Sequence, residues 1–118
     1  MVFKNKDELN FFYNNLIRLF NNSQNEIDFL HFYNILDLLR ILNKKIIDIT
    51  FFEKKTLTIK VTPNHFNALE FIFDINVYEL KKNDFDTFLT FSQHYENLLK
   101  QFENSKNCNF EYRKQSAI

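Results

Sequence analysis

The chain has 118 residues, the size of one domain, and its 15 basic and 15 acidic residues cancel at pH 7. A neutral chain has no net field to attract nucleic acid or an anionic membrane, and a content of 45% hydrophobic residues excludes general disorder. No apolar run reaches the roughly 18 residues of a membrane span, and the first residues lack the pattern of a secretory signal. Cys108 is the only cysteine, so no internal disulfide can form, and we expect a cytoplasmic, reducing location.

The sequence contains no glycine. Phosphate-binding loops, dinucleotide-binding fingerprints and the strained serine turn of hydrolases all depend on glycine, so none of these sites is predicted. We expect asparagine to form the turns instead, because it adopts the left-handed conformation more readily than most residues. An AT-rich genome explains the same composition, since Asn, Lys, Ile and Phe all have AT-rich codons.

Two helices are predicted in the first part of the chain. Residues 7–21 place apolar side chains at helical spacing. Ser23 and Glu26 have the spacing of a capping box, which predicts a second helix over about 24–43. Apolar residues cover most of the circumference of this helix and leave a narrow polar stripe that includes Asp37. We therefore expect a central helix covered on two sides, with the leucines of its middle turns buried: Leu36 and Leu39.

Three strands are predicted after these helices. Residues 46–52 and 56–61 are rich in β-branched residues, and residues 69–80 alternate with the two-residue period of a strand. A last helix is predicted over 84–103, and residues 108–112 fit either a short strand or a disordered tail.

The predicted fold class is α+β, in the order α-α-β-β-β-α. Consecutive strands usually pair, so the three strands form an antiparallel meander packed on the helices. The chain is interpreted as a single domain, 1–118, in which the ends 1–5 and 113–118 are candidates for disorder.

The outer face of the predicted sheet carries apolar residues among polar ones. Three of them are predicted to bind a partner protein or a second copy of the chain: Phe52, Ile72 and Tyr78. Lysine pairs flank the strands. The meander would gather two of these pairs at one end of the sheet: Lys54, Lys55, Lys81 and Lys82. This patch suits an acidic protein surface or a phosphate backbone, and the alternative is that it forms ordinary solvated strand ends.

No arrangement of residues predicts catalysis. The histidines, His31, His65 and His94, lie far apart, and the chain has no pair of cysteines and no dense acidic loop. The sequence therefore predicts no metal, no cofactor and no small-molecule substrate.

We expect a non-enzymatic protein-binding protein. It would be a small intracellular regulator or inhibitor, of the kind that viruses, phages and mobile elements encode, acting stoichiometrically on a partner protein. The alternative is a nucleic-acid-binding module that uses the lysine patch with Tyr78 or Phe52 as stacking residues. The neutral charge balance argues against this alternative.

Overall fold

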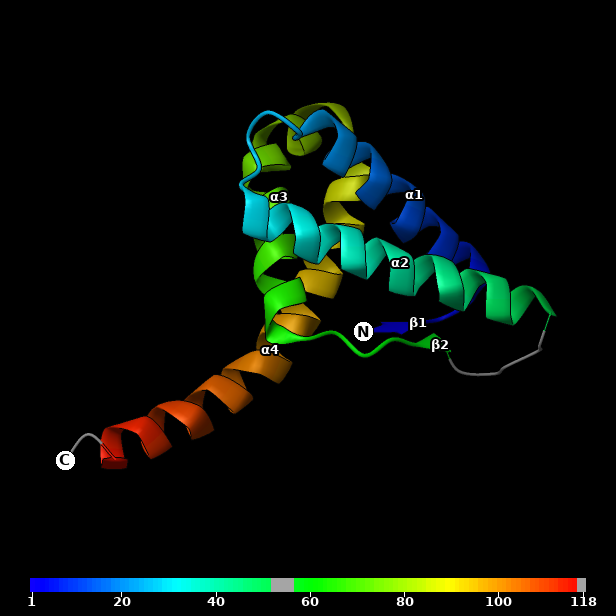
Figure 1. Ribbon diagram of the computed structural model, residues 1–118. Coiled ribbons are helices and arrows are strands. Elements are labelled where there is room, and N and C mark those ends of the chain that lie inside the picture. Colours follow the sequence, from blue (N-terminus) through cyan, green and yellow to red (C-terminus); the bar gives the residue numbers. More distant parts are fainter. Residues whose placement is uncertain (52–56, 117–118) are drawn as a thin grey trace.

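The computed structural model describes the backbone of residues 1–51 and 57–116 and the side chains of residues 1–49 and 57–103. Within these ranges the protein is mostly helical, with four helices and one two-stranded sheet (Figure 1). The predicted α+β fold with a three-stranded meander is therefore wrong.

The helices are α1 (Lys6–Asn22), α2 (Phe29–Phe51), α3 (Pro63–Asn83) and α4 (Phe85–Ser116). The strands are β1 (Val2–Phe3) and β2 (Leu57–Thr58). They pair antiparallel, with Val2 opposite Thr58 and Phe3 opposite Leu57. The helix predicted over 7–21 is confirmed by α1.

The boundary between α1 and α2 differs from the predicted one. Ser23 does not cap α2; it follows the end of α1, and its hydroxyl donates to the carbonyl of Leu19 at 2.7 Å. Helix α2 begins later, at Phe29, where the carboxylate of Asp28 accepts from the backbone N–H of His31 at 2.9 Å. The capping-box pattern failed because a serine at a helix end bonds equally well to the carbonyl four residues before it.

The segment 69–80, predicted as a strand, lies within α3. Helix α3 starts with a capping box, in which the Thr62 side chain accepts from the His65 N–H at 3.1 Å, and Pro63 occupies the first turn. Five residues of this segment at spacings of three and four are buried: Leu69, Ile72, Phe73, Asn76 and Leu80. The apolar residues fit both the two-residue period of a strand and the 3.6-residue period of a helix, and the cap at Thr62 favours the helix.

The other predicted strands are also corrected. Residues 46–52 continue α2 as far as Phe51, and of 56–61 only Leu57–Thr58 forms a strand. Residues 108–112, predicted as a strand or a tail, lie within α4, the second half of which extends away from the other helices (Figure 1).

The N-terminal residues 1–5, a candidate for disorder, instead pack against the rest of the fold. Phe3 is buried, and the backbone of Met1 exchanges hydrogen bonds with Ile59, at 2.9 Å from the Met1 nitrogen and 2.8 Å to the Met1 carbonyl. These bonds extend the β1–β2 pairing by one residue in each strand, Met1 and Ile59.

Turns in the described residues use no positive backbone φ angle. The residue after α1 is Ser23, with φ −106° and ψ 10°, and the residue after α3 is Asp84, with φ −149° and ψ 73°. Both conformations are open to residues with a side chain. The prediction that asparagine supplies left-handed turns is therefore wrong for this part of the chain.

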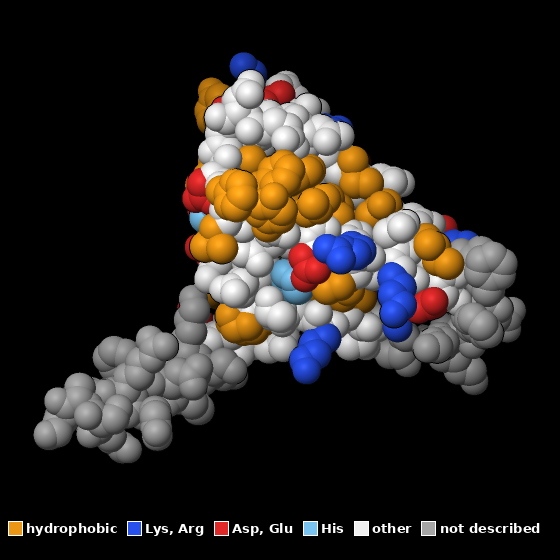
Figure 2. Space-filling view, in the orientation of Figure 1, with side chains coloured by type: hydrophobic (Ala, Val, Ile, Leu, Met, Phe, Trp, Pro, Cys, Tyr) orange, Lys and Arg blue, Asp and Glu red, His pale blue; other side chains and the backbone are white. Residues whose placement is uncertain are grey.

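Within the part of the chain that the structure describes, helix α2 is covered on one side only. Figure 2 shows hydrophobic side chains gathered over its first turns, with charged side chains along the turns that follow. Leu39 is buried as predicted, whereas Leu36 is 41% exposed. The prediction that both are buried assumed a sheet on the second side, and the fold has no such layer in its described part.

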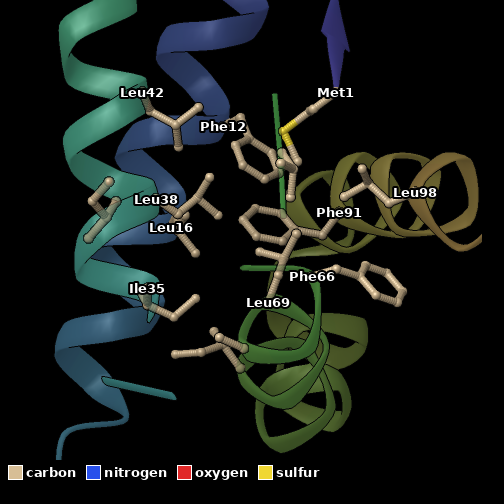
Figure 3. Packing of buried hydrophobic residues seen from close by; sticks show 14 of the residues in the cluster. Met1, Phe12, Leu16, Ile35, Leu38, Leu42, Phe66, Leu69, Phe91 and Leu98 are labelled. Carbon is tan, nitrogen blue, oxygen red and sulfur yellow. The ribbon is translucent and has the colours of Figure 1, made fainter. Parts of the chain in front are cut away.

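All four helices contribute to a single core (Figure 3). Phe12 of α1 stacks on Phe91 of α4 with the ring centres 4.6 Å apart. Leu38 of α2 and Leu69 of α3 are buried in the same core. Because α1, α2, α3 and the first half of α4 share this core, the junction between α3 and α4 is held against the other helices.

Candidate functional site

The structure brings three of the predicted site residues together where α3 meets α4. Four residues line a shallow, open hollow of about 560 Å³ there: Tyr78, Lys81, Lys82 and Phe85. We call these four residues the elbow surface. Tyr78 is 79% exposed and Phe85 is 54% exposed. Tyr78, Lys81 and Lys82 share one side of α3 because residues three and four apart are neighbours on a helix.

The remaining predicted site residues do not join them. Ile72 is fully buried in the core, so its predicted exposure on an outer sheet face is wrong. Phe52, Lys54 and Lys55 lie outside the described residues. Lys81 and Lys82 are close together because they are successive residues of α3, and the predicted sheet end that would gather four lysines does not exist in the described structure.

Asp84 is the single residue between α3 and α4 and bonds to both helices. Its backbone N–H donates to the carbonyl of Leu80 at 2.8 Å and ends α3, while its carboxylate accepts from the Thr87 hydroxyl at 2.8 Å and the Thr87 N–H at 3.3 Å and so caps α4. Arg18 of α1 forms an ion pair with the same carboxylate. The bonds from Thr87, followed by the Arg18 charge, hold the pKa of Asp84 below its usual value.

Aromatic contacts connect the elbow surface to the core. Phe85 stacks on Phe88 at 5.7 Å, and Phe88 stacks on the buried Phe73 at 5.9 Å. The ammonium group of Lys81 lies 5.4 Å from the centre of the Phe88 ring, within the range of a cation–π interaction. Phe85 and Lys81 of the elbow surface are therefore connected to the core through Phe88.

A second link between α3 and α4 lies further from the junction. The Tyr95 hydroxyl donates to a carboxylate oxygen of Glu70 at 2.8 Å. Burial, together with this hydrogen bond and the Glu70 charge, raises the pKa of Tyr95 to about 12. The hydroxyl keeps its proton at neutral pH, so the link persists and helps to fix the two helices.

Sequence reasoning missed Phe85, which the helical pattern of 84–103 places on the buried face. Its exposure follows from its position as the first residue of α4, directly after the Asp84 break, where α3 no longer covers it. The sequence feature that indicates an exposed position here is an aromatic residue directly after an aspartate that caps a helix.

Two other hollows are smaller than the one at the elbow surface. One of about 160 Å³ is lined by polar residues that include Arg18, Asn76 and Asp84, and one of about 250 Å³ is lined by residues that include Met1 and His94. Pockets that enclose small molecules usually measure about 300–1,000 Å³. The side chain of Asn76 is already bonded, to the Ser23 hydroxyl at 2.9 Å and to a carbonyl of its own helix. These hollows do not favour a small-molecule site.

His65 connects α2 to α3 and uses both ring nitrogens to do so. Its Nδ1 accepts from the backbone N–H of Thr62 at 3.2 Å, so the proton is assigned to Nε2, which donates to Asp37 at 2.7 Å. Asp37 also faces Arg40 at 3.6 Å. Asp37 is thus part of a contact between helices and not only of a solvated stripe. With both nitrogens occupied, His65 has none left for a substrate.

His94 is equally buried but less well bonded. Its Nε2 lies 3.3 Å from a carboxylate oxygen of Glu8, yet the atom has no aligned hydrogen bond. The ring centres of Phe3 and Phe12 lie 4.8 and 5.1 Å from the centre of the His94 ring. Burial lowers the pKa of His94, although Glu8 acts in the opposite direction.

His31 lies on the surface of α2, near α3. Its ring stacks on Phe71 at 4.5 Å, and Nδ1 is 2.9 Å from the carboxylate of Asp28. The part of the chain that the structure describes contains no group of three or more His, Cys, Asp or Glu residues that could hold a metal ion.

Comparison of the chain with known protein families, with curated proteins and with solved structures finds no significant match. Among the described residues, no helix has both the length and the apolar character that crossing a membrane requires.

Proposed function

We propose that this chain is a non-enzymatic protein-binding protein that holds its partner on the elbow surface. The observation that supports this function is the hollow at the α3–α4 junction, where two exposed aromatic side chains stand beside two lysines. Tyrosine and other aromatic residues supply much of the binding energy at protein interfaces, especially where the supporting structure is rigid.

The chemistry of the elbow surface favours one kind of partner. Tyr78 and Phe85 offer apolar contact area, and Lys81 and Lys82 place two positive charges at the rim of the same hollow. A matching segment carries an apolar side chain that enters the hollow and carboxylates beside it that face the lysines. A regulator or inhibitor that acts by occupying its partner needs only such a surface, in a one-to-one complex.

The polar groups of the described fold support a role without catalysis. Both ring nitrogens of His65 are bonded within the protein, and His94 is enclosed by Phe3 and Phe12. A general base needs a nitrogen within hydrogen-bond reach of a substrate.

A photo-reactive residue at position 78 tests this proposal in two steps. First, the chain carrying the cross-linker at 78 is expressed in its native host, and the captured protein is identified. A second variant with the cross-linker at Phe11, an exposed aromatic position on α1, is the matched control. We expect a protein that is captured from position 78 and not from position 11.

In the second step the captured protein is purified and titrated directly. The change of Tyr78 and Phe85 to serine should weaken one-to-one binding by at least about 30-fold, as for the loss of a hot spot. The Lys81→Glu, Lys82→Glu variant should slow association and reduce its dependence on salt. Phe11→Ser should bind as the unchanged chain does. Unchanged affinity in both elbow variants would contradict the proposal, as would saturable binding of single-stranded nucleic acid through the same residues.

A further inference from the structure

One row of side chains on α2 is exposed along nearly the whole helix. Its members follow one another at intervals of four and three residues: Phe29, Tyr33, Leu36, Arg40, Asn43 and Ile47. We call this row the α2 seam. Phe29, Tyr33 and Leu36 are 78%, 52% and 41% exposed, and Ile47 at the far end is 49% exposed. Alternating intervals of four and three are the spacing by which one helix packs along another.

The opposite side of α2 already packs on the core. Ile35, Leu38 and Leu42 are fully buried there, so the α2 seam is a second apolar face with no cover in the described structure. Figure 2 shows this face open to solvent, with its hydrophobic side chains gathered over the first turns of α2 and charged side chains along the turns that follow. Leu30, which is 67% exposed, widens the area by one residue. Large continuous apolar areas on a protein surface mark contact sites.

We infer that two copies of this chain associate through the α2 seam, with their α2 helices antiparallel. The charges along the helix favour this arrangement. Exposed acidic residues, Glu26 and Asp28, lie where the chain enters α2. Further along the helix the exposed charged residues are basic, Arg40 and Lys44, while the acidic Asp37 and Asp48 are only partly exposed. An antiparallel pair places the acidic end of each helix beside the basic part of the other.

A parallel pair would have the opposite effect. Each residue of the α2 seam would then face its own copy, so that Arg40 would lie against Arg40 of the second copy. Like charges face to face disfavour such a pair. In the antiparallel pair Tyr33 faces Leu36 of the second copy, and Arg40 faces the ring of Phe29, a contact that suits a cation–π interaction.

The size of the α2 seam predicts a weak dimer. A fully exposed aromatic side chain offers roughly 150–250 Å², so the exposed residues supply a few hundred Å² on each copy. Stable complexes usually bury about 1,200–2,000 Å² in total. We therefore expect dissociation in the micromolar range and a dimer that forms only at high protein concentration.

Sedimentation analysis from micromolar to millimolar concentration tests whether the dimer forms. The average mass should rise toward twice that of the single chain. The Phe29→Ser, Tyr33→Ser variant should remain a monomer throughout, while its circular dichroism and thermal midpoint stay close to those of the unchanged chain, because both positions are exposed. Tyr78→Ser is the matched control on the elbow surface and should dimerise normally. This control separates the dimer from the proposed function.

Cysteine cross-linking tests the direction of the helices. In a Cys108→Ser background, one sample carries Tyr33→Cys and another carries Leu36→Cys. On oxidation the mixture of the two should form a disulfide-linked dimer several-fold more efficiently than either sample alone. Preferred self-linking of each sample would show parallel helices and overturn the inference. A chain that stays monomeric to millimolar concentration would overturn it as well, as would loss of the dimer in Tyr78→Ser.

Discussion

Leu36 and Leu38 are two residues apart in α2, yet Leu38 is fully enclosed and Leu36 keeps 41% of its surface exposed. Their side chains are identical, and the helix is apolar on both faces. The difference arises from what lies opposite each residue. Leu38 contacts a core shared by four helices, whereas no described element covers Leu36. Apolar character therefore identifies the faces of a helix that need a neighbour, and the arrangement of the other elements decides which face receives one.

The largest expected effect comes from truncating the two leucines in turn. Leu38→Ala should lower the free energy of unfolding by about 2–5 kcal/mol, because it leaves a cavity in a packed interior. Leu36→Ala should lower it by less than about 1 kcal/mol, since its side chain is already half in water. Urea unfolding at low protein concentration, where the chain is a monomer, provides the measurement. Equal losses would show that the face bearing Leu36 is also part of a core.

A smaller effect is expected at the polar contact between α2 and α3. Asp37→Ala removes the acceptor of the buried His65 Nε2–H and should cost about 1–3 kcal/mol, the range for an unpaired buried donor. Arg40→Ala removes only the exposed partner of the same carboxylate, 3.6 Å away, and should change stability by less than about 0.5 kcal/mol. Asp37→Asn keeps an acceptor oxygen and should fall between them. If the alanine variants at 37 and 40 behave alike in urea unfolding, the contact with His65 does not stabilise the fold.

Sequence reasoning predicted α1 and the start of α4 because their apolar residues fit the helical period and no competing period. It failed at residues 69–80, where apolar residues fit both periods. Leu69 and Phe73, for example, belong to the alternating pattern and also to the buried face of α3. Thr62 and Pro63 carried the information that decides between the two, since both are typical of a helix start. The end of a strand is an equally ordinary position for proline, so Pro63 also fits a strand predicted over 56–61.

The candidate site was only partly predictable for a related reason. The predicted sheet places Tyr78 on its outer face and Lys81 and Lys82 at one end. In the structure the three lie together because they are neighbours on one helix. Phe85 completes the hollow only because Asp84 ends one helix and caps the next, an arrangement that depends on Arg18 and Thr87. Such a junction depends on contacts between distant parts of the chain, which periodicity does not reveal. That these residues bind a protein stays a prediction.

The smallest expected effect concerns the buried His94 and is a dependence of stability on pH. Burial holds the pKa of His94 below its usual value of 6.5. The unfolded chain then binds more protons than the folded one between that lowered value and about pH 6.5. Stability is therefore at its full value above pH 6.5 and decreases as the pH falls through this window. The charges that face His94 are Glu8 on α1, which opposes this shift, and the Met1 amino group, which adds to it.

The His94→Gln variant isolates this contribution. The substitution removes the titrating group, so the unfolding free energy of the variant should depend less on pH between about 5 and 7 than that of the unchanged chain. The two slopes should differ by no more than roughly 1.4 kcal/mol per pH unit, which is the limit for one proton. Urea unfolding at several pH values gives both curves, and their difference removes the contribution of every other group. Parallel curves would show that His94 titrates alike in the folded and unfolded chain. A chain that gains stability as the pH falls would show instead that the Glu8 charge outweighs burial, and that a carboxylate 3.3 Å away stabilises the protonated ring without an aligned hydrogen bond.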